Sequence, residues 1–417
     1  MIFFRNYFDL IINICVFRFG KTLRSFILSA MQPFQFNTTA GLRVGSGRAT
    51  DTALEVSDKL GKKILFITDP GLKKLGLINE TVDALKKNSE IIIFDRVEAD
   101  PSLKTLMSVV KIGKEFKASG VIGFGGGSSM DVAKLCALLL GSNENLDEAW
   151  GVANAKGPRL PLALYPTTAG TGSEVTPISI ITVDGDEKKG VSSPIILPDL
   201  AILDPNLTLG LPAHITAATG IDAMVHAIEG YASKSANNNV MSKMLAKEAL
   251  KILGRSIKTA VFEGKNILAR TDMLLGSMMA GMAFGNSPVA GVHALAYPLG
   301  GIYHIPHGLS NSLVLPHVLK FNIANSDAAQ LYTELAPSLF PKMDVSTGHQ
   351  DVSARFIENL ASLSKDLGLE QKLRGLNIPE KACAKLASDA MKQTRLLINN
   401  PREITEKDAY NIYKSAW

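Results

Sequence analysis

One aspartate and three histidines are spaced in a way that suits a metal ion. Asp222 and His226 lie four residues apart in GIDAMVHAIEG, so a helix there would place both side chains on one face. His293 lies in GVHALAYPLGG, in a helix expected to stop at Pro298, and His307 begins the next helical segment. One carboxylate and three imidazoles form a borderline ligand set that suits Fe(II), Zn(II), Ni(II) or Co(II).

A purely structural role is the alternative for these residues, because an Asp and a His at helical spacing often form no more than a hydrogen-bonded pair. Four of the seven histidines fall in or beside two short segments rich in small residues, which a surface-charge role does not explain: His226, His293, His304 and His307. Glu229 lies within one turn of His226 and is expected to support the site or to lie at the surface, rather than to bind the ion.

A glycine-rich loop, GFGGGSSMDVAK at residues 123–134, follows a short apolar strand and leads into an apolar helix. Consecutive glycines allow close backbone approach, and the free N–H groups at the helix start suit a phosphate. Ser128 is expected to cap the helix or donate to a phosphate, and Asp131 to lie in the first turn. Such a loop alone is weak evidence, since a tight turn without a ligand has the same pattern.

Two further segments favour a nucleotide. PTTAGTGSEVTP, at residues 166–177, is a second loop of small residues after a strand, with four hydroxyl side chains between Thr167 and Ser173. Asp69 ends the strand KKILFIT, where a carboxylate could bind a ribose diol. In the common Rossmann arrangement the acid follows the glycine loop. Here Asp69 precedes it, which indicates a nucleotide-binding fold of another lineage.

The elements around these residues change type near residue 210. From about residue 60 to 205, short apolar runs alternate with amphipathic segments, a pattern that predicts a mostly parallel sheet covered by helices. After Pro212 only helix-length segments follow, separated by proline and glycine. We expect an α/β Rossmann-like nucleotide-binding domain over residues 31–210 and an all-α metal-binding domain over residues 211–417.

Composition excludes several classes of protein. The net charge is +5, and residues 1–30 carry three of those surplus positive charges, so no basic footprint for nucleic acid is left. Three cysteines without CxxC spacing favour a reducing cytoplasm. No apolar run is long enough to span a bilayer. Residues 1–30 carry no motif, and we expect an extension outside the fold with Met31 as the natural start; a targeting or membrane-surface segment is the alternative.

The motifs together resemble those of the iron-containing (group III) alcohol dehydrogenase family. The resemblance covers roughly residues 32–417 and rests on GGGSSMDVAK, PTTAGTGSEVT, ATGIDAMVHAIE, HALAYPLGGIYHIPHG and the closing NPREITEKDAYNIYKSAW. It implies a homo-oligomer, a dimer or larger, that interconverts a small alcohol and its aldehyde. The ion would polarise the substrate oxygen, and hydride would pass between the substrate carbon and the nicotinamide.

Site residues follow from the same resemblance. The metal, with Fe(II) expected and Zn(II) as the alternative, is assigned to Asp222, His226, His293 and His307. Nucleotide contacts are assigned to two groups, the loop residues Gly126, Gly127, Ser128 and Asp131, and the cleft residues Thr167, Thr168, Thr171, Thr176, Ser179 and Lys189. Asp69 is assigned to the adenosine ribose. An acid there favours NAD over NADP because it repels a 2′-phosphate, although NADP stays as the alternative.

One departure from the family concerns the proton path. Many members have a histidine where this chain has Tyr297, four residues after His293. Proton release is therefore assigned to His304 or Tyr297, with the ribose or water as alternatives. Three other functions remain: a dehydroquinate-synthase-like lyase, whose Glu-His-His set this chain does not show, a maleylacetate-type reductase without metal, and a nucleotide-binding protein without activity.

Overall fold

The computed structural model describes residues 33–142, 144–183 and 187–417. The chain divides into two compact units, Met1–Gln35 and Phe36–Trp417, and every helix and strand named below belongs to the second. The prediction that residues 1–30 stand outside the fold, with Met31 as the natural start, falls outside the described residues.

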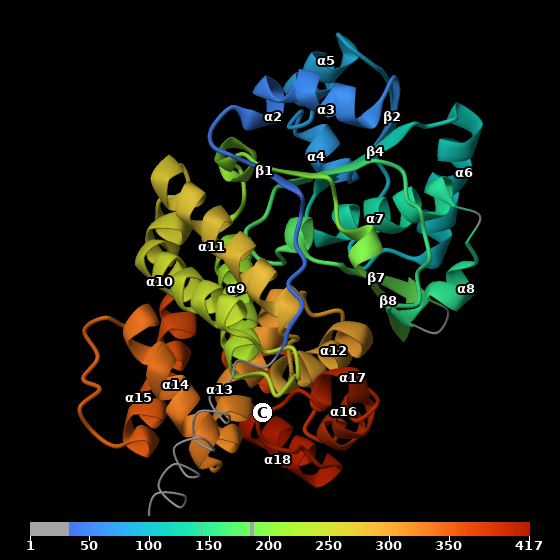
Figure 1. The fold of residues 1–417 in the computed structure, drawn as a ribbon. Helices are drawn as coiled ribbons and strands as arrows, with labels where there is room; N and C mark the ends of the chain where they lie inside the picture. Colours follow the sequence, from blue (N-terminus) through green and yellow to red (C-terminus); the bar gives the residue numbers. More distant parts are fainter. Residues whose placement is uncertain (1–32, 143, 184–186) are drawn as a thin grey trace, which may run out of the picture. The chain divides into compact units, whose positions relative to one another are not determined.

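A parallel sheet organises the first half of the second unit (Figure 1). In the described part of the chain it has the strand order β1-β9-β6-β4-β2-β3, and every pair is parallel. β2 and β4 are neighbours although β3 lies between them in the chain, so the strand order reverses at this point. Ligands of open α/β sheets bind beyond the carboxyl ends of the strands at such a reversal. The strands are β1 (Gly41–Val44), β2 (Lys63–Ile67), β3 (Glu90–Phe94), β4 (Gly120–Gly125), β6 (Leu162–Pro166) and β9 (Leu200–Leu203).

Helices cover both faces of this sheet. Ile64 and Phe66 of β2 pack with α2 (Arg48–Asp51), α3 (Ala53–Leu60) and α5 (Asn79–Lys86). The alternate residues Leu65 and Ile67 pack with α6 (Leu103–Phe116) and α7 (Gly127–Gly141) on the other face. Because both faces are covered, the strands are continuous apolar runs, which is the pattern that predicted them. Shorter helices in this half are α4 (Pro70–Lys74) and α8 (Leu146–Ala149).

A small second sheet has the order β5-β8-β7. Its strands are β5 (Gly151–Val152), β7 (Ile178–Val183) and β8 (Glu187–Ser192), and β7 pairs with β8 antiparallel. The mostly parallel sheet predicted from the apolar runs of residues 60–205 does not include Ile178–Val183, which lies in this second sheet instead. Only three residues separate β7 from β8, and so short a connection joins antiparallel strands, whereas parallel strands need a longer crossover.

Past Ala213 the described residues hold helices and no strands. The change from the α/β half to the helical half falls between β9, which ends at Leu203, and α9. One apolar core includes residues of both elements. α9 is buried on nearly all sides and packs against α10, α11 and α13 (Figure 1). The helices are α9 (Ala213–Ala232), α10 (Val240–Phe262), α11 (Ile267–Asn286), α12 (Gly291–Tyr303), α13 (His307–Asn322), α14 (Ser326–Leu339), α15 (His349–Asp366), α16 (Ala382–Ala390), α17 (Thr394–Leu397) and α18 (Glu406–Ala416).

One helix boundary differs from the prediction. α12 was expected to stop at Pro298, but it continues through this proline to Tyr303. Proline removes one backbone hydrogen bond from a helix interior. Leu295 and Leu299 are fully buried in the same helix, and their packing outweighs that loss. In the part of the chain that the structure describes, no helix combines the length and apolar character that crossing a bilayer requires.

Candidate active site

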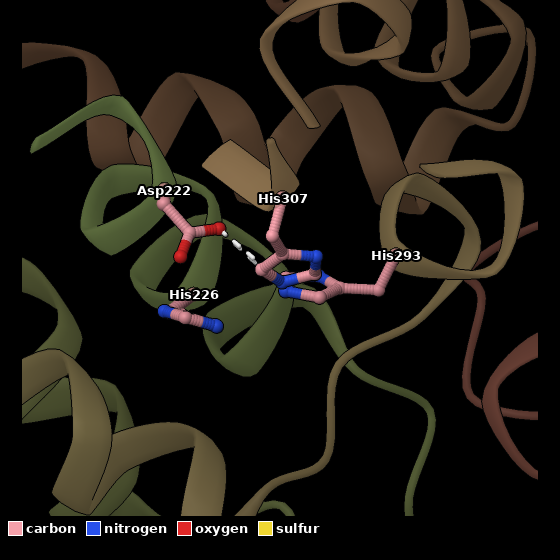
Figure 2. A group of neighbouring side chains, drawn as sticks. All are labelled: Asp222, His226, His293 and His307. Atoms are coloured by element: carbon pink, nitrogen blue, oxygen red, sulfur yellow. Dashed lines mark ion pairs between the residues drawn. The ribbon is translucent and has the colours of Figure 1, made fainter. Parts of the chain in front are cut away.

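Three helices bring the predicted metal-binding side chains together (Figure 2). Asp222 and His226 lie one turn apart on α9, His293 lies on α12, and His307 is the first residue of α13. One ligand atom from each residue can be chosen so that all four atoms lie within 4.8 Å of one another. Asp222 and His293 are each 2% exposed and His226 is 4% exposed. The side chain of His307 is 37% exposed, so the group is compact, shielded on three members and open to the cavity at the fourth.

A glycine allows α13 to start beside α9. A Cβ atom at Gly308 would lie 2.3 Å from the carbonyl oxygen of Ala218 on α9 and 3.3 Å from the Cβ of Asp222. Any larger residue would therefore push the two helices apart. Since His307 precedes this glycine, the close approach brings its imidazole to the carboxylate of Asp222, and His307 Nε2 lies 3.7 Å from Asp222 Oδ1.

Hydrogen bonds orient two of the imidazoles. His226 Nδ1 lies 3.1 Å from the carbonyl oxygen of Gly170, and His293 Nδ1 lies 2.7 Å from Glu229 Oε2. When Nδ1 donates to these oxygens, Nε2 keeps its lone pair for a metal ion. Glu229 also accepts from the backbone N–H of Val292 at 2.6 Å. Of its two expected positions, support or surface, the structure gives the first, because Glu229 is buried beneath His293.

The protonation states suit a cation. Burial lowers the pKa of His226 to about 3 and also lowers the pKa of His307. Burial opposes ionisation of Asp222, but the nearby imidazoles and a hydrogen bond from Asn311 hold the pKa of its carboxyl below the usual range. At neutral pH the group therefore offers the carboxylate of Asp222 and the neutral imidazoles of His226 and His307, which are forms that bind metal ions. The side chains fit a divalent ion that prefers nitrogen and oxygen ligands.

One cavity extends from the three histidines to the glycine loop. It has a volume of about 190 Å³ and is lined from the helical half by His226, Phe284, Val289, His293, Tyr297, His307, Arg395 and Leu396. Its other wall comes from the α/β half and contains five of the predicted nucleotide contacts: Gly127, Ser128, Asp131, Thr171 and Thr176. A ligand bound at the loops would thus face the three histidines, which are grouped with Asp222.

The glycine loop is built by backbone more than by side chains. Gly125 has φ +153°, and a Cβ atom at Gly127 would come within 3.0 Å of Thr171 in the second loop. α7 begins at Gly127 with Gly126 at its cap position and no side-chain cap. Of the two roles expected for Ser128, capping is excluded because Ser128 lies inside the first turn, and donation to a phosphate stays a prediction. Its hydroxyl is left to face the cavity.

Asp131 joins the two loops. It is the fifth residue of α7, so it lies beyond the first turn in which it was expected. Its carboxylate accepts from Ser173 Oγ at 2.7 Å and from the backbone N–H of Ile180 at 2.9 Å. Buried Lys134, one turn later, donates to Ser173 Oγ at 2.8 Å, and burial lowers the pKa of its ammonium to about 8. The sequence analysis missed Lys134, although its spacing from Asp131 in DVAK is that of helix neighbours.

The neighbour of a predicted lysine, and not that lysine itself, lines the cavity. Lys188 lines the cavity and pairs with Asp100, whereas Lys189 does not line it. Side chains alternate along a strand, so adjacent residues of β8 point to opposite faces. In the antiparallel pairing of β7 and β8, Lys188 lies opposite Thr182, which also lines the cavity. The register of β8, which no local motif reveals, decides which lysine faces the site.

Five other predicted nucleotide contacts lie off the cavity wall. Asp69 does not end a strand: β2 ends at Ile67, and Asp69 caps α4 by accepting from the N–H of Leu72 at 2.9 Å. It still lies at the carboxyl edge of the sheet, where β2 neighbours β4. The other four are Gly126, whose Cβ position lies 3.6 Å from Thr168 Oγ1, the threonines Thr167 and Thr168 themselves, and fully buried Ser179, whose hydroxyl donates to the carbonyl of Asp131.

The two residues proposed for proton transfer lie in different environments. Tyr297 lines the cavity, and its ring centroid is 6.0 Å from that of His307. His304 is exposed, follows the end of α12 with φ +53°, and is not among the residues that line the cavity. Other wall residues had no role in the sequence analysis; among them Asp100, Phe284 and Arg395 lie in none of its motifs.

Comparisons with known proteins agree with this arrangement. Residues 40–205 match the family model described as iron-containing alcohol dehydrogenase, and residues 216–417 match the C-terminal model of the same family. Long-chain-alcohol dehydrogenase 1 of Geobacillus thermodenitrificans is 39% identical over 381 residues, which cover 90% of this chain and 94% of that protein.

Solved structures extend the match to the fold. A 1,3-propanediol oxidoreductase is 32% identical, with a TM-score of 0.88 over 93% of this chain and 100% of that one. A sulfoacetaldehyde reductase from Bifidobacterium kashiwanohense, solved with NAD+, is 28% identical, with a TM-score of 0.79 over 92% of this chain and 98% of that one. The chain therefore belongs to the iron-containing alcohol dehydrogenase family and is an alcohol dehydrogenase or aldehyde reductase of that family.

Proposed function

We propose that the chain uses NAD(H) to interconvert small alcohols and their aldehydes at a divalent ion held by Asp222, His226, His293 and His307. The observation that carries this proposal is one cavity lined both by the imidazoles of His226, His293 and His307, which are grouped with Asp222, and by residues of the glycine and threonine loops. Fe(II) is the expected ion, and Zn(II) is the alternative, since both accept imidazole and carboxylate ligands. NADP is the alternative cofactor.

The chain's own residues would bind and orient the reactants. Gly127 and Ser128 offer N–H groups and a hydroxyl at the start of α7, where a pyrophosphate is stabilised by the helix dipole. Thr171 and Thr176 line the path from that helix toward the imidazoles. When bound, the ion supplies Lewis acidity toward a hydroxyl or carbonyl oxygen, and the nicotinamide accepts or donates hydride.

Phe284, Val289 and Leu396 form an apolar part of the wall beside the imidazoles, where the carbon chain of a small alcohol would lie. Tyr297 borders the same space, and we assign proton transfer between substrate and solvent to its hydroxyl. His304 is the weaker candidate because it is exposed and away from the lining residues.

The other functions on this fold fit the geometry less well. A lyase with a Glu-His-His set would need a glutamate among the ion's ligands, but Glu229 contacts the far nitrogen of His293, Nδ1. A reductase that works without metal, or a protein that only binds nucleotide, leaves four converging ligand groups without a use.

Two statements about the whole protein are also proposals. We propose a homo-oligomer, a dimer or larger, and a cytoplasmic location; the free cysteines Cys136 and Cys383 are both buried, as a reducing compartment permits. Light scattering on the purified chain would measure the first, and localisation in intact cells the second.

An activity screen tests the proposed reaction. The full-length protein, loaded with Fe(II) or with Zn(II), would be supplied with short and long primary alcohols and NAD+, and with the matching aldehydes and NADH. We expect turnover with at least one substrate pair and a preference for NAD(H). No turnover with any pair, with either ion and with either NAD(H) or NADP(H), would rule the proposal out.

A further inference from the structure

Asn311 contacts three of the four proposed metal ligands through one atom. It lies on α13, one turn after His307. Its Nδ2 lies 2.6 Å from Asp222 Oδ1, 3.3 Å from His293 Nε2 and 3.2 Å from His307 Nε2. The side chain is fully buried, so water does not compete for these contacts. The sequence analysis assigned Asn311 no role.

The contact with Asp222 decides which way the amide faces. A carboxylate oxygen at 2.6 Å would repel the amide oxygen, so the group directed at Asp222 is the NH2. Asn311 Oδ1 is then buried with no hydrogen-bond partner among the described residues. Leaving a buried acceptor unpaired costs free energy. A side chain that only filled space would avoid this cost, which indicates that the position of the NH2 matters.

The helices explain why asparagine suits this position. α13 starts in backbone contact with α9, since a Cβ atom at Gly308 would lie 2.3 Å from the carbonyl oxygen of Ala218. A short amide can therefore cross from α13 to Asp222. The hydrogen bond from Asn311 to Asp222 joins two helices that also carry proposed ligands, since His307 is on α13 and His226 is on α9.

We infer that Asn311 is a positioning residue that holds Asp222 and keeps the ligand group assembled before an ion binds. This inference rests on the proposed function. Without a cation, the carboxylate and the imidazole lone pairs repel one another, and the amide hydrogens between them reduce that repulsion. The bond to Oδ1 also fixes the rotation of the Asp222 carboxylate. Hydrogen bonds that orient ligands in this way raise metal affinity.

Competition with a chelator on the full-length protein would test the inference. Asn311→Leu keeps most of the volume and removes the donors, so we expect metal affinity to fall about 10- to 100-fold, with NAD affinity unchanged. Asn322→Leu is the matched control. Asn322 is a buried amide at the end of the same helix and bonds to Tyr332 and Asn400. Its loss should lower the melting temperature without changing metal affinity.

A second variant separates the donor from the shape. Asn311→Asp keeps the shape but places a second carboxylate beside Asp222, so the metal-free protein should melt lower than wild type and should gain more stability on adding Zn(II). Asn311→Ala replaces Asn311→Leu if the latter does not fold. Wild-type metal affinity in the donor-free variant, with tight binding in the parent, would overturn the inference and leave the proposed function intact. A wild-type protein that binds no ion would overturn both.

Discussion

The two walls of the cavity are built in different ways. On the helical side, the proposed chemistry rests on buried side chains: Asp222, His226 and His293 have little freedom. Glu229 and Asn311 hold His293 and Asp222 by hydrogen bonds from the same side, and Gly170 of the second loop holds His226 from the α/β side. On the α/β side, glycines, hydroxyls and free N–H groups would bind the cofactor under the proposed function, and Asp131 with Lys134 ties the two loops together. The difference suggests that the metal and the cofactor can be lost separately, and the following variants test that.

Removing a ligand should have the largest effect. His293→Ala leaves an incomplete metal site, so we expect the bound ion to be lost and alcohol oxidation to fall by about 1000-fold or more. NAD affinity should stay near wild type because the loops lie on the other wall. Elemental analysis, cofactor titration and turnover on one preparation would check this. The control is His317→Ala, a histidine of α13 outside the group; equal losses in both variants would contradict the assignment.

Gly127→Val is the converse test, since it should weaken NAD binding and leave the metal site intact. Its side chain would crowd Thr171, which already lies 3.0 Å from the Cβ position, and would fill the space at the start of α7. We expect NAD affinity to fall by about 100-fold, as the loss of a pyrophosphate site implies, while metal content stays the same. Loss of metal together with NAD would show that the two walls are not independent.

Two adjacent lysines test the strand register. Lys188→Ala removes a cation from the cavity wall and should raise the KM for NAD about 10-fold, as the loss of one charged hydrogen bond does. Lys189→Ala is the matched control for Lys188→Ala, since the Lys189 side chain points to the opposite face of β8. Steady-state kinetics of both variants would decide, and a larger effect for Lys189→Ala would support the original sequence-based assignment.

Asp69 should affect cofactor choice more than rate. Its carboxylate is expected to bind the ribose diol and repel a 2′-phosphate, so Asp69→Gly should shift the ratio of kcat/KM for NAD over NADP about 10-fold toward NADP. The same change removes the cap of α4, and the melting temperature would report that separately. If the ratio is unchanged, Asp69 only caps the helix.

The smallest effect is expected from residues 1–30. A variant that begins at Met31 should keep kcat/KM and melting temperature within about twofold and a few degrees of the full chain, as removal of a segment outside a fold does. Thermal unfolding and steady-state kinetics would check this. A clear loss of either property would show that the segment packs on the enzyme.

The sequence predicted the helical wall better than the α/β wall, for a physical reason. Aspartate and histidine are recognisable as metal ligands from residue type alone. Asp222, His226, His293 and His307 could therefore be selected before their contacts were known. Lys188 could not be told from Lys189, because that needs the pairing of β8 with β7. The small antiparallel sheet, the continuation of α12 through Pro298 and the contacts of Asn311 depend on tertiary packing, which no local pattern contains.

The proposed role of the four ligand residues is tested most directly by titrating the metal-free enzyme. The full-length protein would be stripped by a chelator, and turnover of an alcohol with NAD+ would be followed as Fe(II) or Zn(II) is added in small steps. We predict negligible turnover without metal, then a linear rise that levels off at one ion per chain, with binding lost in His307→Ala. Full activity after complete removal of metal, or normal turnover by His307→Ala, would contradict it.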